Sequence, residues 1–392
     1  MRIGFLTLEY PPEQIGGLGN SLASTIAQFS FDEAVVLLNV TDRRQRGELK
    51  DASGRRVIKE RLMRKFLWPT WMPTLKAVRR FVKKEKIDFL HVSHLLPLGY
   101  AALWAKWWRR TPFIISLHGL DVKSAAAHFW KRQMARMILR RAHLITVNSE
   151  ATKKNLLSLF NARDRVKIGT RVIVVYPCAH LTPARFPVSE SAMNDLRSRY
   201  AVERKWILLS IGRMIKRKGF DAVIAALPVI LKKYHDLVYV LVGDGPEINA
   251  LGRQVVELGL QNSVRFTGPL SDLETAEWLS VANVFIMPSR ESKEDVEGFG
   301  IVFLEAAAFG KPAIGGAGGG VGEAIIEGET GIIVDPEKTE EIVRATSRLK
   351  DDATLALTLG ERARLRNQKD FQPEIQVQKL KSRLTELPTR KA

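Results

Sequence analysis

The sequence lacks the features that would mark a disulfide-stabilised or membrane-spanning protein. Cys178 is the only cysteine in 392 residues, so no intramolecular disulfide can form, which fits a reducing compartment. No run of about 18 uninterrupted apolar residues occurs, so we expect no membrane-spanning helix. The apolar run at the start is too short for the core of a signal peptide, and no small-residue cleavage site follows it. These absences predict a protein of the cytoplasm.

Acidic residues are scarce in one half of the chain only. The formal net charge is +19, from 61 basic and 42 acidic side chains. Residues 1–200 carry 35 basic and 15 acidic side chains, whereas residues 201–392 carry 26 and 27. The excess is greatest between residues 51 and 141, with 21 basic and 5 acidic side chains. The first half is therefore expected to face an anionic partner, which the second half does not need.

What the sequence does contain is a repeated alternation of apolar strands and helices. The length fits two domains, and a hydrophobic content of 45% supports sizeable cores. The first series of strands is predicted at residues 2–8, 34–40, 88–93, 113–119, 143–149 and 171–177. The second series is predicted at residues 206–213, 237–245, 263–268, 283–289 and 312–316. Continuous apolar strands between helices indicate parallel sheets covered on both faces, so we expect an α/β fold of two doubly wound domains.

The domain limits follow from the same pattern. We expect an N-terminal domain over residues 1–182 and a C-terminal domain over residues 203–372, joined by the polar stretch around residues 181–204. A last helix over residues 373–387, in a final segment 373–392, is expected to pack back on the N-terminal domain.

Two candidate sites in the first half follow predicted strands, where doubly wound domains bind ligands. The loop over residues 9–20 contains Gly16, Gly17 and Gly19, which permit positive φ and close backbone approach before a helix that starts at about Ser21. This suits an anion, although a flexible turn is the alternative. The glycines do not form a G-x-G-x-x-G fingerprint, so a nicotinamide cofactor is poorly supported. His118 follows another strand, as a ligand-facing or a structural histidine.

The second half offers a basic loop and a glycine turn. Arg213, Lys216, Arg217 and Lys218 lie between a strand and a helix, where they could clamp a diphosphate or form a solvated basic loop. Position after the strand favours Arg213 and Lys218 over the middle pair. Gly243 lies in the turn after the next strand, which structural use alone would also explain.

Residues 294–312, EDVEGFGIVFLEAAAFGKP, place Glu297 and Glu305 eight positions apart around an apolar run. The pattern predicts a buried helix over residues 301–309, with Glu297 in the loop before it and the backbone N–H groups near Gly298 and Gly300 exposed. A carboxylate accepts two vicinal hydroxyls, so one glutamate on a sugar and one on a ribose would explain the pair. The alternative, a capping Glu297 and a solvated Glu305, would leave Glu305 as a costly charge in an apolar face.

The segment E-G-F-G-I-V-F-L-E resembles the E-x7-E motif of retaining GT-B glycosyltransferases of family 4. Other motifs match in the same order and extend the resemblance over nearly the whole chain: Gly16-Gly17-Leu18-Gly19, His118-Gly119-Leu120-Asp121, Ile211-Gly212-Arg213 through Lys218-Gly219, Val242-Gly243-Asp244-Gly245, and Gly318-Gly319-Gly320 with Glu323. The charged residues before Glu297 are most similar to bacterial members, some of which, such as phosphatidylinositol mannosyltransferases, glycosylate lipids. Residues 176–180, YPCAH, depart from the Asn-Gly-Val-Asp-like turn common in the family, which puts the acceptor side in doubt.

The resemblance implies a GT-B fold of two Rossmann-like domains and a nucleoside-diphosphate sugar as donor. Its donor-binding and catalytic positions here would be Gly16, Gly17, His118, Arg213, Lys218, Gly243, Glu297, Phe299, Gly300, Ile301 and Glu305. Arg213 and Lys218 would hold the diphosphate, Glu305 the ribose, and Glu297 with the backbone of residues 299–301 the sugar. His118 would approach the sugar from the N-terminal side, and the first glycines would bring backbone amides to phosphate.

The resemblance also implies retention of anomeric configuration and no metal or other cofactor. The sequence agrees with this expectation, because it has no D-x-D motif that could serve a metal-bound diphosphate. The sugar is expected to be mannose or glucose, while the residues leave the base, the acceptor and the linkage open.

Aromatic residues interleaved with cations suggest a meaning for the basic first half. Residues 55–86 and 103–110 show this pattern, the latter with Trp104, Trp107 and Trp108. Tryptophan beside lysine and arginine suits an anionic membrane surface, so we expect a peripheral enzyme on the inner face of the cytoplasmic membrane, with a lipid or glycan acceptor. An ordinary basic surface with core tryptophans is the alternative.

Other functions fit parts of the sequence. A nucleic-acid binder would use the charge but leaves the second half unexplained, and no recognised nucleic-acid module appears, so we expect no nucleic-acid partner. A glycosyltransferase with a soluble acceptor, a non-catalytic sugar-nucleotide-binding protein and a sugar-nucleotide epimerase remain open.

Overall fold

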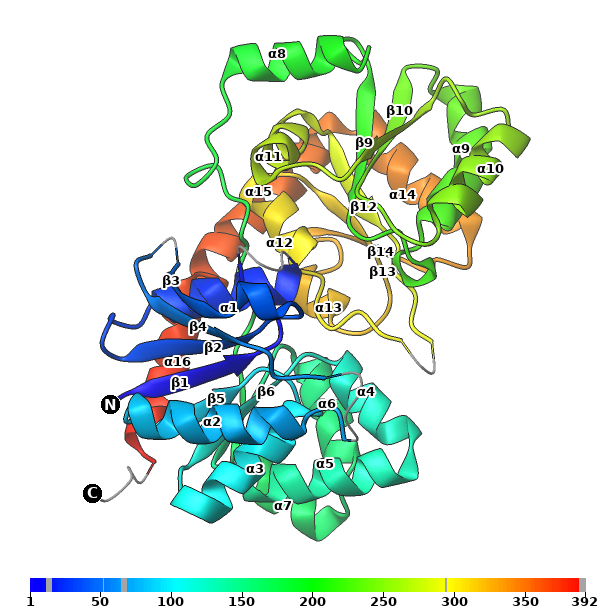
Figure 1. Ribbon diagram of the computed structural model, residues 1–392. Coiled ribbons are helices and arrows are strands. Elements are labelled where there is room, and N and C mark those ends of the chain that lie inside the picture. The colour runs from blue at the N-terminus through cyan, green and yellow to red at the C-terminus, as the bar shows by residue number, and fades with distance from the viewer. Residues whose placement is uncertain (12–15, 52, 65–68, 293–294, 388–392) are drawn as a thin grey trace. The chain divides into compact units, whose positions relative to one another are not determined.

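A computed structural model of the chain describes residues 1–11, 16–51, 53–64, 69–292 and 295–387 (Figure 1). The chain forms two compact units. Unit 1 comprises Met1–Cys178 and Pro373–Ala392, and unit 2 comprises Ala179–Gln372. The boundary therefore lies at Cys178. The predicted linker belongs to unit 2, because helix α8 (Glu190–Arg199) packs against helix α11 (Asp272–Val281).

The described residues of unit 1 form an eight-stranded sheet in the order β3-β4-β2-β1-β5-β6-β7-β8. Its strands are β1 (Ile3–Thr7), β2 (Ala34–Asn39), β3 (Gly47–Lys50), β4 (Arg56–Glu60), β5 (Phe89–Val92), β6 (Phe113–Leu117), β7 (Leu144–Val147) and β8 (Val172–Val174). All neighbours pair in parallel except β3 and β4, an antiparallel edge pair. The sequence pattern did not predict β3 and β4, because their charged, partly exposed residues give no apolar run.

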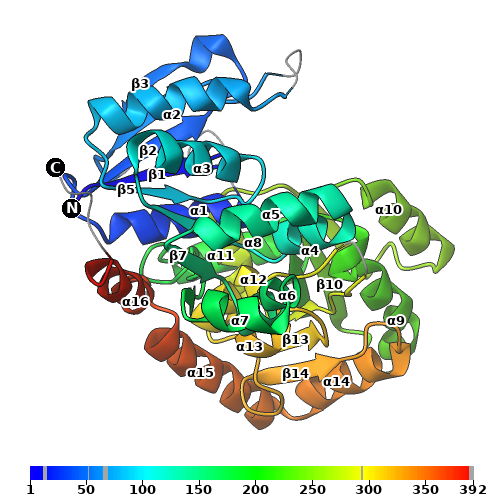
Figure 2. The same cartoon turned by 90° about the horizontal axis from the view of Figure 1, so that it is seen from below.

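Helices cover both faces of the sheet of unit 1, as the continuous apolar strands require. They are α1 (Gly17–Ala27), α2 (Met72–Lys84), α3 (Leu98–Arg109), α4 (Leu120–Ala127), α5 (Phe129–Arg141), α6 (Glu150–Ser158), α7 (Ala162–Gly169) and α16 (Pro373–Thr385), with a 3₁₀ turn, η1 (Arg43–Gln45). One core contains apolar side chains of α2, α3 and α5, and a second contains those of α1 and α16. Helices α2 and α3 lie on one side of the strands and α1 on the other (Figure 2).

Helix α16 belongs to unit 1 although nearly 200 residues of unit 2 precede it. Leu380 and Leu384 are buried with Ile3 and Phe5 of β1. The buried side chain of Gln376 accepts a hydrogen bond of 3.0 Å from the backbone N–H of Tyr176. The last helix thus completes the core of the unit that the first strand starts.

The described residues of unit 2 form a six-stranded parallel sheet in the order β11-β10-β9-β12-β13-β14. Its strands are β9 (Trp206–Ile211), β10 (Leu237–Val242), β11 (Val264–Gly268), β12 (Val284–Met287), β13 (Ala313–Gly316) and β14 (Gly331–Val334). Besides α8 and α11, its helices are η2 (Lys216–Lys218), α9 (Phe220–Lys233), α10 (Ile248–Glu257), α12 (Ile301–Ala308), α13 (Val321–Ala324), α14 (Thr339–Asp351) and α15 (Ala353–Asp370). The predicted α/β fold with two doubly wound sheets is confirmed.

Within the described ranges, no helix is both long and apolar enough to cross a membrane.

Candidate active site

In unit 2 the strand order reverses between β9 and β12, and both strands end at the same edge of the sheet. Such a reversal leaves a crevice beyond the carboxyl ends of the two strands, which is where doubly wound sheets bind ligands. The loop after β9 leads into η2, and the loop after β12 leads to α12. These two segments carry the basic and acidic site residues that the sequence predicts in this unit, namely Arg213, Lys218, Glu297 and Glu305.

Glu297 and Lys218 meet at this edge. The Lys218 Nζ donates a 2.7 Å hydrogen bond to Glu297 Oε2, and the Arg217 guanidinium donates to the same oxygen. Arg217 also forms a 3.0 Å ion pair with Asp295. All of Arg217, Lys218 and Glu297 are largely buried, so water screens these charges only weakly.

The cations decide the ionisation of Glu297. Burial alone would raise its pKa, but the charges of Lys218 and Arg217 outweigh burial and hold the pKa below its ordinary value. Glu297 is therefore a carboxylate at neutral pH, able to accept hydrogen bonds from hydroxyl groups.

Arg217, which the sequence pattern placed in the less favoured middle pair, contacts Glu297 together with Lys218. Residues 216–218 form the 3₁₀ turn η2, in which successive side chains point about 120° apart. Lys216 is consequently exposed and pairs with Asp221, while Arg217 and Lys218 turn toward Glu297. Arg213 is exposed on the same loop and has no ion-pair partner in the described part of the chain.

Glu305 lies one turn into α12 and is partly buried. Burial raises its pKa to about 7, and the backbone N–H of Leu181, 3.4 Å from Oε1, offsets only part of that effect. The Glu305 carboxyl therefore takes up a proton at a much higher pH than an exposed glutamate does. The sequence argument that Glu305 occupies an apolar environment agrees with this position.

The segment between the two glutamates forms a tight helix start. Gly300 precedes α12 with φ of +86°, and a Cβ there would lie 2.6 Å from the ring of Phe303, so only glycine fits. No side chain caps α12, so the N–H groups at its start, which include that of Ile301, are oriented to receive an acceptor. The Phe299 side chain is buried, which leaves only its backbone for a ligand.

Gly243 has a structural reason to be glycine. Its φ is +125°, and a Cβ would lie 2.3 Å from the carbonyl oxygen of Gly212 in the neighbouring loop. The backbones after β9 and β10 therefore approach closely at this residue, which fits the structural alternative for this turn.

His118 lies in unit 1, at the end of β6. Burial, with smaller contributions from His94 and His91, lowers the pKa of His118 to about 3, so the ring is neutral at physiological pH. Its Nε2 is buried and has no hydrogen-bond partner within the described ranges. The Asp121 carboxylate accepts from the backbone N–H groups of His118 and Val122 at 3.1 and 2.9 Å, which fixes the start of α4.

Gly16 and Gly17 lie at the end of the β1 loop, of which residues 12–15 are outside the described residues. Helix α1 begins at Gly17, earlier than the expected Ser21, and Gly16 is its N-cap. Gly16 has an extended backbone with φ of −171°, so its conformation does not use the positive φ that glycine permits. Without a side-chain cap, the first N–H groups of α1 remain suited to an anion.

Cys178 and His180 have structural environments. Burial raises the pKa of the Cys178 thiol to about 12. Arg185 donates to His180 Nδ1 at 3.1 Å, and His180 Nε2 lies 2.8 Å from Asp272 Oδ2. Because an arginine can only donate, Nε2 carries the ring proton and donates it to Asp272.

An aromatic groove of about 820 Å³ lies among α2, α3 and α5 of unit 1. Its lining is Trp71, Leu75, Tyr100, Leu103, Trp104, Lys106, Trp107, Met137 and Arg141. Trp107 is 81% exposed, while Trp108 is stacked on Trp104 at 5.5 Å. None of the three tryptophans of α3 is a core residue, which disfavours the alternative of core tryptophans. The predicted aromatic stretch over residues 55–86 includes residues 65–68, which lie outside the described residues.

In the described part of the chain, no group of three or more His, Cys, Asp or Glu side chains is arranged to hold a metal ion.

Two family models match the chain. Residues 15–178 match Glycosyltransferase Family 4, and residues 193–366 match Glycosyl transferases group 1.

Curated relatives match along most of the chain. A GDP-mannose-dependent alpha-(1-6)-phosphatidylinositol monomannoside mannosyltransferase of Mycobacterium tuberculosis is 27% identical over 370 residues, covering 92% of this chain and 91% of that protein. A D-inositol 3-phosphate glycosyltransferase of Corynebacterium kroppenstedtii is 30% identical over 313 residues, covering 75% of this chain and 67% of that protein.

A solved structure supports the fold. The Anabaena protein HepE, in a crystal structure with UDP-glucose, superimposes with a TM-score of 0.80 over 99% of this chain and 100% of that one. The sequences are 21% identical, so this likeness shows the fold alone. With the two sheets described above, it confirms the predicted GT-B fold.

Proposed function

The chain belongs to the family 4 glycosyltransferases, with a group 1 glycosyl transferase domain in its second half, and we propose that it transfers a hexose from a nucleoside-diphosphate sugar to a membrane lipid. The observation that carries the proposal is the contact of Glu297 with Lys218 and Arg217 at the carboxyl edge of the unit 2 sheet. This arrangement places cations for a diphosphate beside a carboxylate for sugar hydroxyls.

In the proposed mechanism, the cations act on the leaving group. Lys218, Arg217 and the exposed Arg213 bind the diphosphate and neutralise the charge that develops when its bond to the sugar breaks. Three cations supply this charge from the protein, so the proposal includes no metal ion. Activity is accordingly expected to persist in the presence of a chelator.

The hydroxyl groups of the donor bind the acidic and backbone groups. Glu297 and the N–H groups at the start of α12 hold the sugar, and Glu305 accepts hydrogen bonds from the ribose. The neutral His118 and the first N–H groups of α1 are proposed as donor contacts from unit 1. The anomeric configuration is retained by displacement on the same face of the sugar.

A lipid acceptor is supported by the surface of unit 1. Trp107, Phe129 and Trp130 expose their rings on α3 and α5, and Lys106 and Arg141 line the aromatic groove. Exposed aromatic rings with adjacent cations suit the headgroup region of an anionic membrane, so we propose peripheral attachment to the cytoplasmic face. The name of the mycobacterial relative supports mannose, carried by GDP, as the first donor to test.

A soluble phosphorylated acceptor is a second candidate. It is favoured by one observation, the similarity to a D-inositol 3-phosphate glycosyltransferase, which is the more identical of the two relatives described.

The proposal is tested by measuring nucleoside-diphosphate release from GDP-, UDP- and ADP-sugars, alone, with bacterial polar lipids, and with inositol phosphate. We expect one donor to react and lipid to accelerate release. Lys218→Gln is expected to lower release at least about 100-fold, because a buried charge contact with the diphosphate is lost. Lys233→Gln is the matched control, since Lys233 is exposed and pairs with Asp351 in the same unit.

Stimulation by inositol phosphate alone would favour the second candidate. Equal loss in the two lysine variants would reject Lys218 as a diphosphate ligand.

A further inference from the structure

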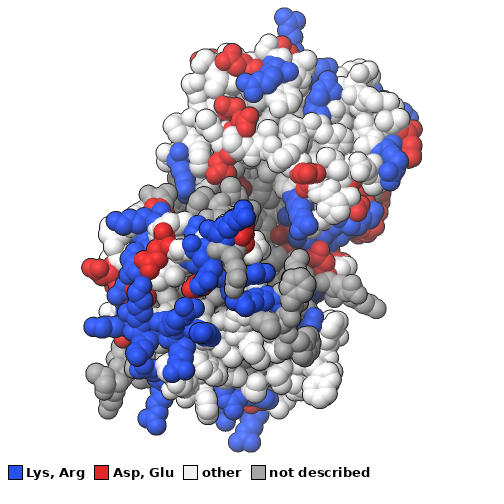
Figure 3. All heavy atoms as spheres, viewed as in Figure 1, with Lys and Arg blue, Asp and Glu red and all other residues white. Residues whose placement is uncertain are grey.

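A small basic cavity lies beside α2 in unit 1, and no step of the proposed mechanism uses it. It has a volume of about 240 Å³ and lies between the end of β4 and α2. Its lining is Arg46, Glu60, Arg61, Arg64, Pro73, Lys76, Ala77 and Arg80. Figure 3 shows Lys and Arg side chains gathered over the part of unit 1 that carries β3, β4 and α2.

The cavity has more cations than its single carboxylate can neutralise. Glu60 accepts hydrogen bonds of 2.9 and 3.2 Å from Arg46 and lies 3.4 Å from Arg80. Arg61, Arg64 and Lys76 have no carboxylate partner among the residues that the structure describes. Four positive charges therefore remain uncompensated in the lining.

Two donors in this cavity need an acceptor. The Nε atoms of Arg61 and Arg64 are buried and have no hydrogen-bond partner within the described ranges. A buried N–H group without a partner is costly, and buried polar groups in proteins are nearly always hydrogen-bonded. Charge and unsatisfied donors thus point to the same kind of ligand, an anion with several acceptor oxygens.

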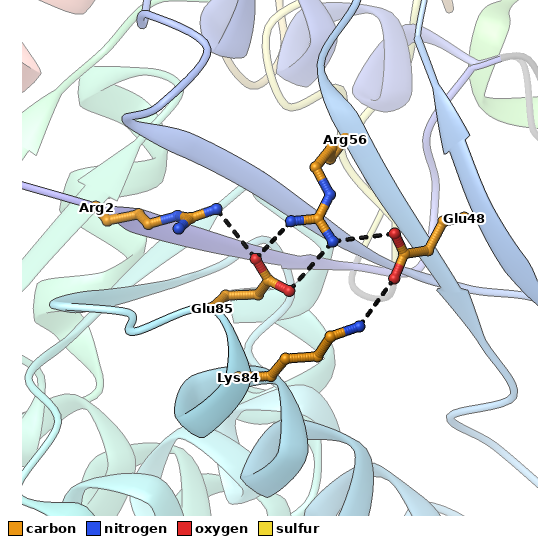
Figure 4. A network of polar contacts seen from close by, with 5 residues as sticks. All are labelled: Arg2, Glu48, Arg56, Lys84 and Glu85. Carbon is orange, nitrogen blue, oxygen red and sulfur yellow. Dashed lines mark hydrogen bonds and ion pairs between the residues drawn. The ribbon is translucent and has the colours of Figure 1, made fainter.

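The other end of α2 carries a network in which arginine and lysine side chains are paired with carboxylates. There, Arg56 and Lys84 pair with Glu48 and Glu85, as Figure 4 shows. The three cations of that network, Arg2, Arg56 and Lys84, each have a carboxylate within 3.2 Å.

We propose that this cavity binds a phosphate group carried by the headgroup of a membrane phospholipid. The planar forks of Arg61 and Arg64 match the geometry of phosphate oxygens, and Lys76 adds a point charge. A cavity of this size suits one phosphate group, whereas a nucleic acid needs an extended groove for consecutive phosphates. The phosphate chemistry stands on the cavity alone, and the choice of a phospholipid as its source rests on the proposed function.

Helix α2 adds support for the lipid source. Its residues Lys76 and Arg80 line the basic cavity, while Leu75 and the preceding Trp71 line the aromatic groove. One helix thus presents an anion site and an apolar surface, the two chemistries of a phospholipid.

The test compares the full chain with the double variant Arg61→Gln/Arg64→Gln and a control, Lys83→Gln/Lys84→Gln, which removes the same charge at the other end of α2. Binding of inorganic phosphate is measured by calorimetry at low salt. Binding of vesicles is measured by sedimentation, with phosphatidic acid in phosphatidylcholine against phosphatidylcholine alone. Loss of two charge-assisted hydrogen bonds is expected to weaken binding at least about tenfold in the first variant. The control is expected to change binding by about twofold or less.

Either probe alone can support the site. Selective loss with both probes, or with vesicles only, supports a lipid-borne phosphate, and selective loss with inorganic phosphate only supports a site for free phosphate. Equal loss in the two variants, or no binding of either probe by the parent chain, overturns the proposal. Lys76→Glu, at an exposed position of α2, is expected to give the same selective loss if the double variant does not fold. Release of nucleoside diphosphate from donor without lipid is measured on the same samples, so failure of the cavity and failure of the proposed function are distinguishable.

Discussion

Glu297 accepts hydrogen bonds from the cations that a diphosphate would also need. A donor phosphate must therefore compete with this carboxylate for Lys218 and Arg217. Glu297→Gln removes the competing charge, so we expect a free nucleoside diphosphate to bind about tenfold more tightly. Sugar transfer is expected to fall about 100-fold or more, because the hydroxyl acceptor is lost. Calorimetry and a release assay measure the two effects separately.

A matched control for this variant is Glu337→Gln. Glu337 is an exposed carboxylate of unit 2 that pairs with Arg290, and its replacement should leave both binding and transfer unchanged within about twofold. Weaker binding of the nucleoside diphosphate to the Glu297→Gln variant would contradict the competition described here.

Glu305 is expected to make stability depend on pH. Its pKa is about 7 in the folded chain against 4.5 as the ordinary value, so the folded state binds the extra proton between these values. The free energy of unfolding should therefore fall as pH rises from about 4.5 to 7, by about 3 kcal/mol in total. Urea unfolding at several pH values measures this slope. In Glu305→Gln that contribution should disappear, and an unchanged slope would argue against the raised pKa.

The residues of the candidate site differ in how well a sequence pattern predicts them. Glu297, Lys218 and Glu305 were identified because they interrupt or follow apolar runs at the carboxyl ends of strands. Arg217 was given less weight, since its inward direction depends on the 3₁₀ turn and not on spacing. Asp295 was missed because its contact with Arg217 joins segments about 80 residues apart, which no local pattern can reveal.

Among the elements, the edge of the unit 1 sheet depends on a buried carboxylate. Glu85, at the end of α2, is 2% exposed and forms ion pairs with Arg2 of the N-terminal strand region and Arg56 of β4, at 3.0 and 2.9 Å (Figure 4). Glu85→Ala should lower the free energy of unfolding by about 1–2 kcal/mol. The loss stays below that of a fully buried pair, because both arginines reach water.

The same network supplies the comparison for Glu85. Glu48 is half exposed and also pairs with Arg56, so Glu48→Ala should cost less than about 1 kcal/mol. Urea unfolding of the two variants measures the difference, and equal losses would mean that burial of Glu85 has no particular importance.

At this scale, apolar alternation predicted the central strands well, because each is buried on both faces. It could not predict the edge strands β3 and β4, whose stability comes from pairing and from ion pairs such as those of Arg56. Their position at the edge of the sheet explains why they can be charged.

For the whole molecule, α16 is expected to stabilise unit 1 and not unit 2. Leu380→Ala removes a buried side chain from the core shared with β1 and should cost about 2–4 kcal/mol. Leu357→Ala, at a position 73% exposed on α15, should cost less than about 0.5 kcal/mol. Hydrogen exchange distinguishes the units: protection should fall in β1 and β2 and persist in β9 and β10. Equal losses in both sheets would show that α16 has no preference for unit 1.

The division at Cys178 and Pro373 has a consequence for biosynthesis. A ribosome translates most of unit 1 before unit 2, but the helix that closes the second core of unit 1 is translated after the whole of unit 2. Unit 2, which is continuous in sequence, can fold while unit 1 still exposes the apolar surface that Leu380 and Leu384 will cover. The half of the chain that starts to emerge first is thus the half whose folding is completed last, so an early stop in translation would leave its core open.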